Sequence, residues 1–158
     1  MKKSKLSHVD PSGNPSMVDV SEKTVTRRTA KAQAIVSPGH DIIRLISEDE
    51  LITKKGPVFQ TAILAGIMGA KRTSDLIPMC HPLGLEDCDV NIEVRGDDII
   101  ITSTATLSAK TGVEMEALTA ASVAALTVYD MCKALSHHIV IREIKLLEKT
   151  GGKKDFQL

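Results

Sequence analysis

The sequence predicts an α+β fold in which helices cover one face of a four-stranded antiparallel sheet. Four segments have the β-branched or alternating composition of strands, and three have the composition of helices. Their order along the chain is β, α, α, β, β, α, β. If the first two helices count as one crossover, this order is the split βαβ arrangement called ferredoxin-like.

The first half of the chain supplies one strand and two helices. Residues 18–36 are dense in β-branched residues and alternate in part, which predicts a long strand with one side facing solvent. Residues 40–49 have the spacing of a short helix. Residues 58–72 are rich in small and apolar residues and follow Pro57, which suits a first helical turn because its missing amide costs no hydrogen bond there.

The second half supplies a hairpin, a long helix and a last strand. Residues 73–85 contain two prolines four residues apart, so this segment cannot be a regular helix or a central strand. Residues 85–95 and 99–107 have strand composition and flank a turn, which predicts a hairpin. Residues 138–149 alternate again and predict the fourth strand, followed by a polar tail over residues 150–158.

Residues 111–135, TGVEMEALTAASVAALTVYDMCKAL, predict the longest helix. Thr111 and Glu114 match a capping box, in which the hydroxyl and the carboxylate satisfy free amides of the first turn, and they set the predicted start. An apolar stripe at helical spacing is predicted to lie on the sheet. The stripe consists of Ala117, Ala121, Ala124, Val128, Met131, Cys132 and Leu135.

The opposite side of this helix mixes polar and apolar residues and therefore predicts a second covering surface. It carries Met115, Glu116, Thr119, Ser122, Val123, Leu126, Thr127, Asp130 and Lys133. Glu116 and Asp130 lie within about 40° on the helical wheel but about 21 Å apart along the axis. One small substrate cannot touch both in one chain, so we expect two copies packed antiparallel to share a site.

The composition argues against several classes of protein. Lys plus Arg and Asp plus Glu both number 20 and aromatic residues make up 2%, so there is neither a basic field nor a stacking platform for nucleic acid. The 3 cysteines form no CxxC pair, which argues against a disulfide framework and a four-ligand zinc site. With no apolar run long enough to span a membrane and no signal peptide, we expect a cytoplasmic protein.

The chain length predicts one domain with a hydrophobic core of its own. Residues 1–16 hold Pro11, Gly13 and Pro15 among polar residues and predict a flexible amino-terminal arm. Residues 17–158 are then expected to form a single ferredoxin-like domain, which would carry any catalytic site.

Two sets of residues could carry chemistry, and each has a simpler interpretation. Asp130 and Lys133 share one side of the helix, either as a surface ion pair or as a partly desolvated pair with shifted pKa values, which the apolar neighbours favour. His81 either packs in its loop or acts on a substrate. Cys80 could be a metal ligand or a nucleophile, but no other ligand lies at a metal spacing, so we expect no metal.

Scattered cations could bind phosphate as point charges, or could simply keep the surface hydrated. They are Lys54, Lys55, Lys71, Arg72, Lys149, Lys153 and Lys154. The GGKK sequence near the carboxyl end is not a P-loop, because it lacks the upstream glycine and the following Ser or Thr.

Five segments together resemble a known family. MVDVSEK, KKGPVF, GAKRTSDLIPMCHPL, TGVEMEALTAASVAALTVYDMCKA and KTGGKKDF are similar, in this order, to the molybdenum cofactor biosynthesis protein C family (MoaC), the cyclic pyranopterin monophosphate synthases. The resemblance runs from about residue 17 to residue 156 and omits only the amino-terminal arm.

The resemblance implies a ferredoxin-like subunit that assembles as a homohexamer, a trimer of dimers with active sites at the dimer interface. The implied activity is that of a lyase in molybdopterin biosynthesis. It converts the cyclised dihydro-GTP, (8S)-3′,8-cyclo-7,8-dihydroguanosine 5′-triphosphate, to cyclic pyranopterin monophosphate and pyrophosphate. The resemblance implies that this reaction needs no redox cofactor.

The resemblance also assigns site residues. Those implied to be catalytic are Asp130, Lys133 and Lys55. Those implied to bind substrate are Met79, Cys80, His81, Glu114, Met115, Glu116 and Lys149.

These residue types suit the implied chemistry. Opening the purine and closing the pyran ring need proton transfers, which we assign to Asp130 and Lys133. Expelling pyrophosphate builds negative charge, which Lys55 and His81 would stabilise. Two other functions stay open from the residues alone: a ligand-binding or regulatory module that holds a nucleotide without changing it, and a purely structural oligomer.

Overall fold

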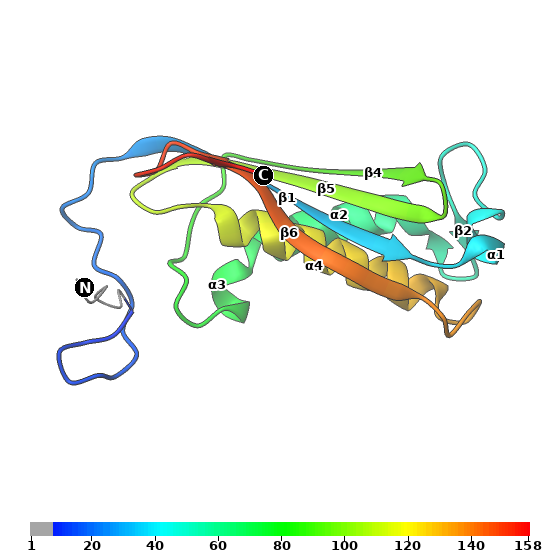
Figure 1. Ribbon diagram of the computed structural model, residues 1–158, viewed down its shortest axis with the longest axis horizontal. Coiled ribbons are helices and arrows are strands. Elements are labelled where there is room, and N and C mark those ends of the chain that lie inside the picture. Colours follow the sequence, from blue (N-terminus) through cyan, green and yellow to red (C-terminus); the bar gives the residue numbers. More distant parts are fainter. Residues whose placement is uncertain (1–7) are drawn as a thin grey trace.

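Five antiparallel strands form one sheet in the order β4-β5-β1-β6-β7, in a computed structural model that describes residues 8–158 (Figure 1). A second, two-stranded sheet pairs β2 with β3. The elements are β1 (Thr26–Ser37), α1 (His40–Ile43), β2 (Ile52–Thr53), β3 (Gly56–Pro57), α2 (Val58–Lys71), α3 (Thr73–Leu76), β4 (Asp87–Arg95), β5 (Asp98–Ala109), α4 (Glu114–Cys132), β6 (Val140–Thr150) and β7 (Phe156–Gln157). The predicted α+β class is thus confirmed.

The helices α2 and α4 lie on the same face of the sheet (Figure 1). Alternation in β1 explains why, because Ala30, Ala32, Ala34 and Val36 are all buried on one side of the strand. Small alanines on β1 and along α4 let the helix lie close to the strand. A buried hydrogen bond also links α4 to the sheet: the Ser103 hydroxyl of β5 donates to the carbonyl oxygen of Ala117 over 2.7 Å.

The predicted apolar stripe of α4 packs on the sheet, but the opposite side is covered differently from the prediction. Helix α2 covers part of it, because a Cβ added at Gly69 would stand 2.7 Å from Cγ2 of Val123. Val123 is therefore covered within the chain and needs no second subunit. Leu126, 59% exposed, is not covered by this chain.

The predicted start of α4 is wrong. The helix begins at Glu114, and no side chain caps it. The Glu114 carboxylate, which the capping box would direct back to the Thr111 amide, instead accepts a hydrogen bond from Lys149 on β6 at 2.8 Å. The helix also ends at Cys132, which leaves Leu135 outside it and 49% exposed.

Two strand predictions also need correction. The first strand begins at Thr26, and the chain before it, including Val18, is irregular. The sheet has five strands because the tail, predicted as a polar segment after the fourth strand, contributes β7, in which Phe156 pairs with Lys149. The four long strands keep the order β4-β5-β1-β6. The predicted hairpin is present, with Arg95 opposite Asp98.

The predicted arm lies partly outside the described residues, which begin at residue 8. Within the described part, a backbone hydrogen bond from Ser16 to His8 and a bridge between Val9 and Pro15 close a small loop. Asp10 stabilises this loop by accepting from the amides of Ser12 and Asn14 at 2.8 Å. Across residues 8–158, no helix is long and apolar enough to cross a membrane.

Candidate functional site

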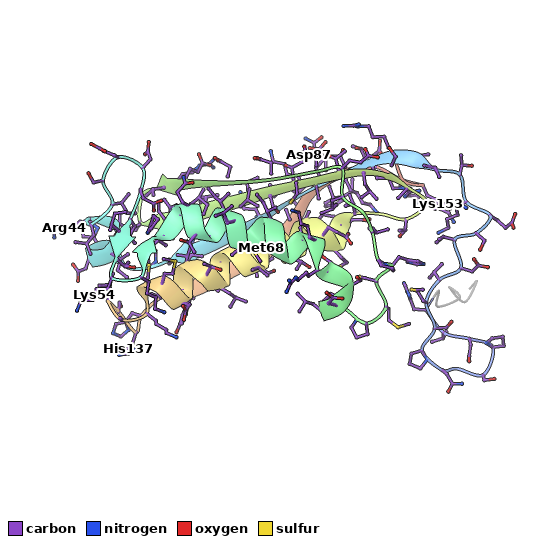
Figure 2. All side chains as sticks on the ribbon, turned by 180° about the vertical axis from the view of Figure 1, so that it is seen from behind. Arg44, Lys54, Met68, Asp87, His137 and Lys153 are labelled. Atoms are coloured by element: carbon purple, nitrogen blue, oxygen red, sulfur yellow. The ribbon has the colours of Figure 1, made fainter. Side chains whose placement is uncertain are left out.

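The ten predicted site residues fall into two groups at opposite ends of α4. One group is Lys55, Asp130 and Lys133, here called the lysine–aspartate cluster. The other lines a cavity at the start of α4, here called the α4 pocket. Figure 2 shows Lys54, the neighbour of Lys55, and Lys153, which lines the pocket, at opposite ends of the molecule. Because Glu116 and Asp130 both lie within α4, the groups are about 21 Å apart along its axis.

In the lysine–aspartate cluster one carboxylate holds two ammonium groups. Lys55, on the turn that joins β2 and β3, donates to Oδ2 of Asp130 at 2.7 Å and to the Asp130 carbonyl oxygen at 3.0 Å. Lys133, just after the end of α4, lies 2.7 Å from Oδ1 of Asp130. The structure thus brings together, at one carboxylate, the three residues that the resemblance implies to be catalytic.

The cluster is charged and exposed, not desolvated. Hydrogen bonds from Lys133 and then Lys55 lower the pKa of Asp130 to about 2. The hydrogen bond between Lys133 and Asp130 also raises the pKa of Lys133. The side chains of Asp130 and Lys133 are 54% and 55% exposed, so the predicted desolvation is wrong for the single chain. Both groups are held in their ionised forms near neutral pH.

The α4 pocket is a cavity of about 950 Å³. This volume suits a nucleotide-sized ligand. Its walls come from residues 8–25, which precede β1 and are from here on called the amino-terminal arm, and from the irregular segment after α3, the start of α4 and the end of β6. The lining includes seven predicted residues: Met79, Cys80, His81, Glu114, Met115, Glu116 and Lys149.

The pKa values of the two acids of the pocket are shifted in opposite directions. Burial raises the pKa of Glu114, but the hydrogen bond from Lys149 and weaker effects outweigh it, so the net pKa is lowered. Glu116 is only 3% exposed, and burial raises its pKa, as does the charge of Glu114. The pocket thus contains one acid held as a carboxylate and one whose proton is retained to higher pH.

His81 and Cys80 differ in what they can do. Nε2 of His81 lies 2.9 Å from the carbonyl oxygen of Val18, which joins the pocket loop to the arm. Burial raises the pKa of the Cys80 thiol, and Glu116 adds to the effect, so Cys80 is a poor thiolate nucleophile. Among residues 8–158, no group of three His, Cys, Asp or Glu side chains is arranged to hold a metal ion.

Residue-by-residue reasoning did not predict that the arm lines the pocket or that Lys153 lies there. His8, Val18, Val20 and Lys23 also line the cavity. The one signal for this side of the pocket in the sequence is the segment MVDVSEK, residues 17–23, which carries the resemblance. Lys153 was only one of several scattered candidate cations, and here it lies at the pocket.

The fold and the pocket define an α+β protein with a cavity that is lined by acids and cations and is large enough for a small-molecule ligand. A comparison with protein families identifies it further. The MoaC family model matches residues 17–152, and the chain belongs to this family. MoaC proteins are enzymes of molybdenum cofactor biosynthesis that act on a small-molecule substrate.

Proposed function

We propose that this protein is a cyclic pyranopterin monophosphate synthase. It converts (8S)-3′,8-cyclo-7,8-dihydroguanosine 5′-triphosphate to cyclic pyranopterin monophosphate and releases pyrophosphate, as a lyase. Membership of the MoaC family carries the proposal. The α4 pocket supports it, because it joins a buried acid, a histidine and several cations in one nucleotide-sized cavity.

We propose that the active site is shared between two copies of the chain. About 21 Å of α4 separates Glu116 in the pocket from Asp130 in the cluster, which is too far for one substrate to touch both. Two α4 helices packed antiparallel would bring the cluster of one copy to the pocket of the other. The exposed Leu126 lies between the two groups, where such a contact would cover it. The implied trimer of dimers would contain three such pairs of sites.

The order of the four long strands supports assigning the domain, residues 17–158, to the ferredoxin-like class. The fifth strand would then be an addition to the edge of that sheet.

The cluster is suited to the phosphate step. In that step a substrate hydroxyl oxygen bonds to the α-phosphorus and loses its proton, while the bond from the α-phosphorus to the pyrophosphate oxygen breaks. Lys55 and Lys133 are fixed in position by Asp130 and have further N–H donors for the developing negative charge. Asp130 acts here by holding the two ammonium groups, since its low pKa makes it a weak base.

The pocket is better suited than the cluster to proton transfer. A catalytic acid or base works best with a pKa near the working pH. The pKa of Glu116 is shifted upward by burial, toward that range, whereas the pKa of Asp130 is shifted away from it. We therefore assign proton transfer at the ring to Glu116, which revises the expectation that placed it on Asp130 and Lys133.

The reaction is tested by incubating pure protein with the cyclised nucleotide and measuring pyrophosphate and the pterin product. We expect turnover by the wild type and a loss of roughly a hundredfold or more for Asp130→Asn and Lys133→Ala, with the oligomer intact. Binding of the nucleotide without pyrophosphate release would favour a ligand-binding module. Absence of both would favour a structural oligomer.

The shared site is tested by mixing two inactive variants, Asp130→Asn and Glu116→Gln, under conditions in which subunits exchange. If each site draws its cluster and its pocket from different copies, some mixed sites contain neither substitution and activity returns. No recovery, with subunit exchange verified by mass spectrometry, would show that each site belongs to one chain.

A further inference from the structure

We propose that Glu50 is a positioning residue that fixes Lys55 at the carboxylate of Asp130. It does so by holding the main chain of the β2–β3 hairpin, from which Lys55 extends. The inference rests on the proposed function, in which Lys55 stabilises the negative charge that develops in the phosphate step. Glu50 was not among the predicted site residues.

The hairpin that carries Lys55 is too small to keep its conformation unaided. Strands β2 and β3 have two residues each and form a two-stranded sheet of their own, separate from the main sheet. An isolated two-stranded hairpin is at best marginally stable in water. Contacts with the surrounding chain must therefore fix the place from which Lys55 extends.

One oxygen of Glu50 holds both ends of this hairpin. Oε1 accepts from the Leu51 amide, just before β2, and from the Phe59 amide, just after β3, each at 2.8 Å. These two hydrogen bonds are here called the Glu50 clamp. The Val58 amide also donates to the Leu51 carbonyl oxygen at 2.9 Å. Leu51 and Phe59 are buried in the core, so the clamp joins the base of the hairpin to the packed part of the domain.

The main chain of Glu50 is fixed in turn by a tight turn. Ser47 and Glu50 exchange two backbone hydrogen bonds, of 2.9 and 3.0 Å. Between them, Glu48 and Asp49 have φ angles of 52° and 57°, a left-handed conformation that is uncommon outside glycine. Strained backbone of this kind persists only where the surrounding structure enforces it. The turn therefore presents the Glu50 carboxylate to the hairpin from a fixed position.

At the tip of the hairpin, Thr53 fixes the backbone of Lys55 itself. The Thr53 hydroxyl oxygen accepts from the Lys55 amide at 3.2 Å, and the hydroxyl donates to the Gly56 carbonyl oxygen at 3.3 Å. Gly56 has a φ of 108°, which a side chain would disfavour. The Lys55 ammonium group then meets Oδ2 of Asp130 at 2.7 Å. Glu50 at the base and Thr53 at the tip thus determine where this ammonium group lies.

Fixing the main chain matters because the side chain of Lys55 is 49% exposed and is not held in place by packing. Misplacement of a catalytic group by about 1 Å can cost roughly a hundredfold in rate. A cation that stabilises charge developing in the transition state contributes to kcat more than to KM. Loss of the Glu50 clamp should therefore lower kcat while the substrate still binds.

Turnover of the cyclised nucleotide by the full-length protein tests the inference, together with hydrogen exchange of residues 51–59 measured by mass spectrometry. Glu50→Ala should lower kcat roughly tenfold, with a smaller change in KM, and should accelerate exchange across the hairpin. Glu50→Gln keeps an acceptor oxygen for the clamp, so it should retain most of kcat and near-wild-type exchange. Glu148→Ala, which removes an exposed carboxylate of β6, is the control and should change neither. All variants are assayed well below their melting temperatures.

The two measurements separate failure of this inference from failure of the proposed function. Wild-type kcat in Glu50→Ala despite faster exchange would overturn the positioning role and leave the reaction in place. Wild-type exchange in Glu50→Ala would overturn the clamp. Equal loss of kcat in Glu50→Gln and Glu50→Ala would assign the effect to the charge of Glu50, which also overturns the clamp. A wild-type protein that releases no pyrophosphate would remove the reaction, and the exchange measurement would still decide the clamp.

Discussion

The His81 ring is oriented by the arm, because its Nε2 atom lies 2.9 Å from the carbonyl oxygen of Val18. A carbonyl oxygen can only accept, so Nε2 carries a proton. In the neutral ring Nδ1 is then an acceptor. His81 cannot donate to a phosphate through Nε2 while this contact persists, and it would donate through Nδ1 only as imidazolium.

Substitution of His81 can separate the anchoring of the arm from the chemistry. His81→Gln retains an N–H donor near the Nε2 position but loses the ring, whereas His81→Ala loses both. We expect turnover to fall about a hundredfold or more in both variants. Hydrogen exchange of residues 17–23 should accelerate in the alanine variant and stay near wild type in the glutamine variant. Equal acceleration in both would contradict a role for the side-chain donor in anchoring.

Much of the fold could be predicted because its elements have strong periodicity. The sheet is open to solvent on one side, so β1 alternates and is recognisable from Ala30 to Val36. The long α4 has a continuous stripe of small residues that needs a surface to pack on. The hairpin between β4 and β5 contains Gly96, whose φ of 61° suits a tight turn.

The errors arise where tertiary contacts decide the structure. Residues 18–25 have strand-like composition, but β5 ends at Ala109, opposite Thr26, so no partner strand continues alongside them. The two residues of β7 are too few to show a period, and pairing with β6 creates the strand. Lys23 and Lys149 line the same cavity although they are far apart in sequence. No local sequence pattern predicts that they lie at one site.

Glu116 should make the protein less stable as the pH rises. Its folded pKa lies above the ordinary value of 4.5, so between these two values the folded state holds a proton that the unfolded state has lost. Stability from this group therefore falls as pH rises through 4.5 and beyond. Glu116→Gln should raise the melting temperature at pH 7, with no difference near pH 4, while it abolishes turnover. A variant that is less stable than wild type at pH 7 would contradict the burial argument.

Gly69 is required for the close packing of α2 on α4. An added Cβ would lie 2.7 Å from Cγ2 of Val123, which is shorter than a van der Waals contact. Gly69→Ala should lower the free energy of unfolding in urea by about 1–3 kcal/mol. Combining it with Val123→Ala should recover part of this loss.

Gly84 provides the matched control for that prediction. Nothing lies within 4 Å of a Cβ added there, and its φ is not positive, so Gly84→Ala should leave stability unchanged or slightly higher. Additive effects of Gly69→Ala and Val123→Ala would show that the two side chains do not collide.

The carboxylate of Glu50, a residue outside α2, caps the amino-terminal end of this helix. The residue before the helix, Pro57, provides no side-chain hydrogen bond. Instead, Oε1 of Glu50 accepts from the Phe59 amide at 2.8 Å, and Oε2 accepts from the Gln60 amide at 3.1 Å. A carboxylate at this position also complements the positive end of the helix dipole.

Removing this carboxylate should destabilise the protein at the first turn of α2 and at the Leu51 amide, which donates to Oε1 of Glu50 at 2.8 Å. Glu50→Ala leaves first-turn amides unpaired and should lower the free energy of unfolding by about 1–2 kcal/mol in urea. Glu50→Gln keeps one acceptor oxygen and should fall between the alanine variant and wild type. The exposed Glu148, changed to Ala, is the control for loss of one carboxylate and should have little effect. If Glu50→Ala and Glu148→Ala were equally stable, the capping of α2 by Glu50 would contribute nothing measurable.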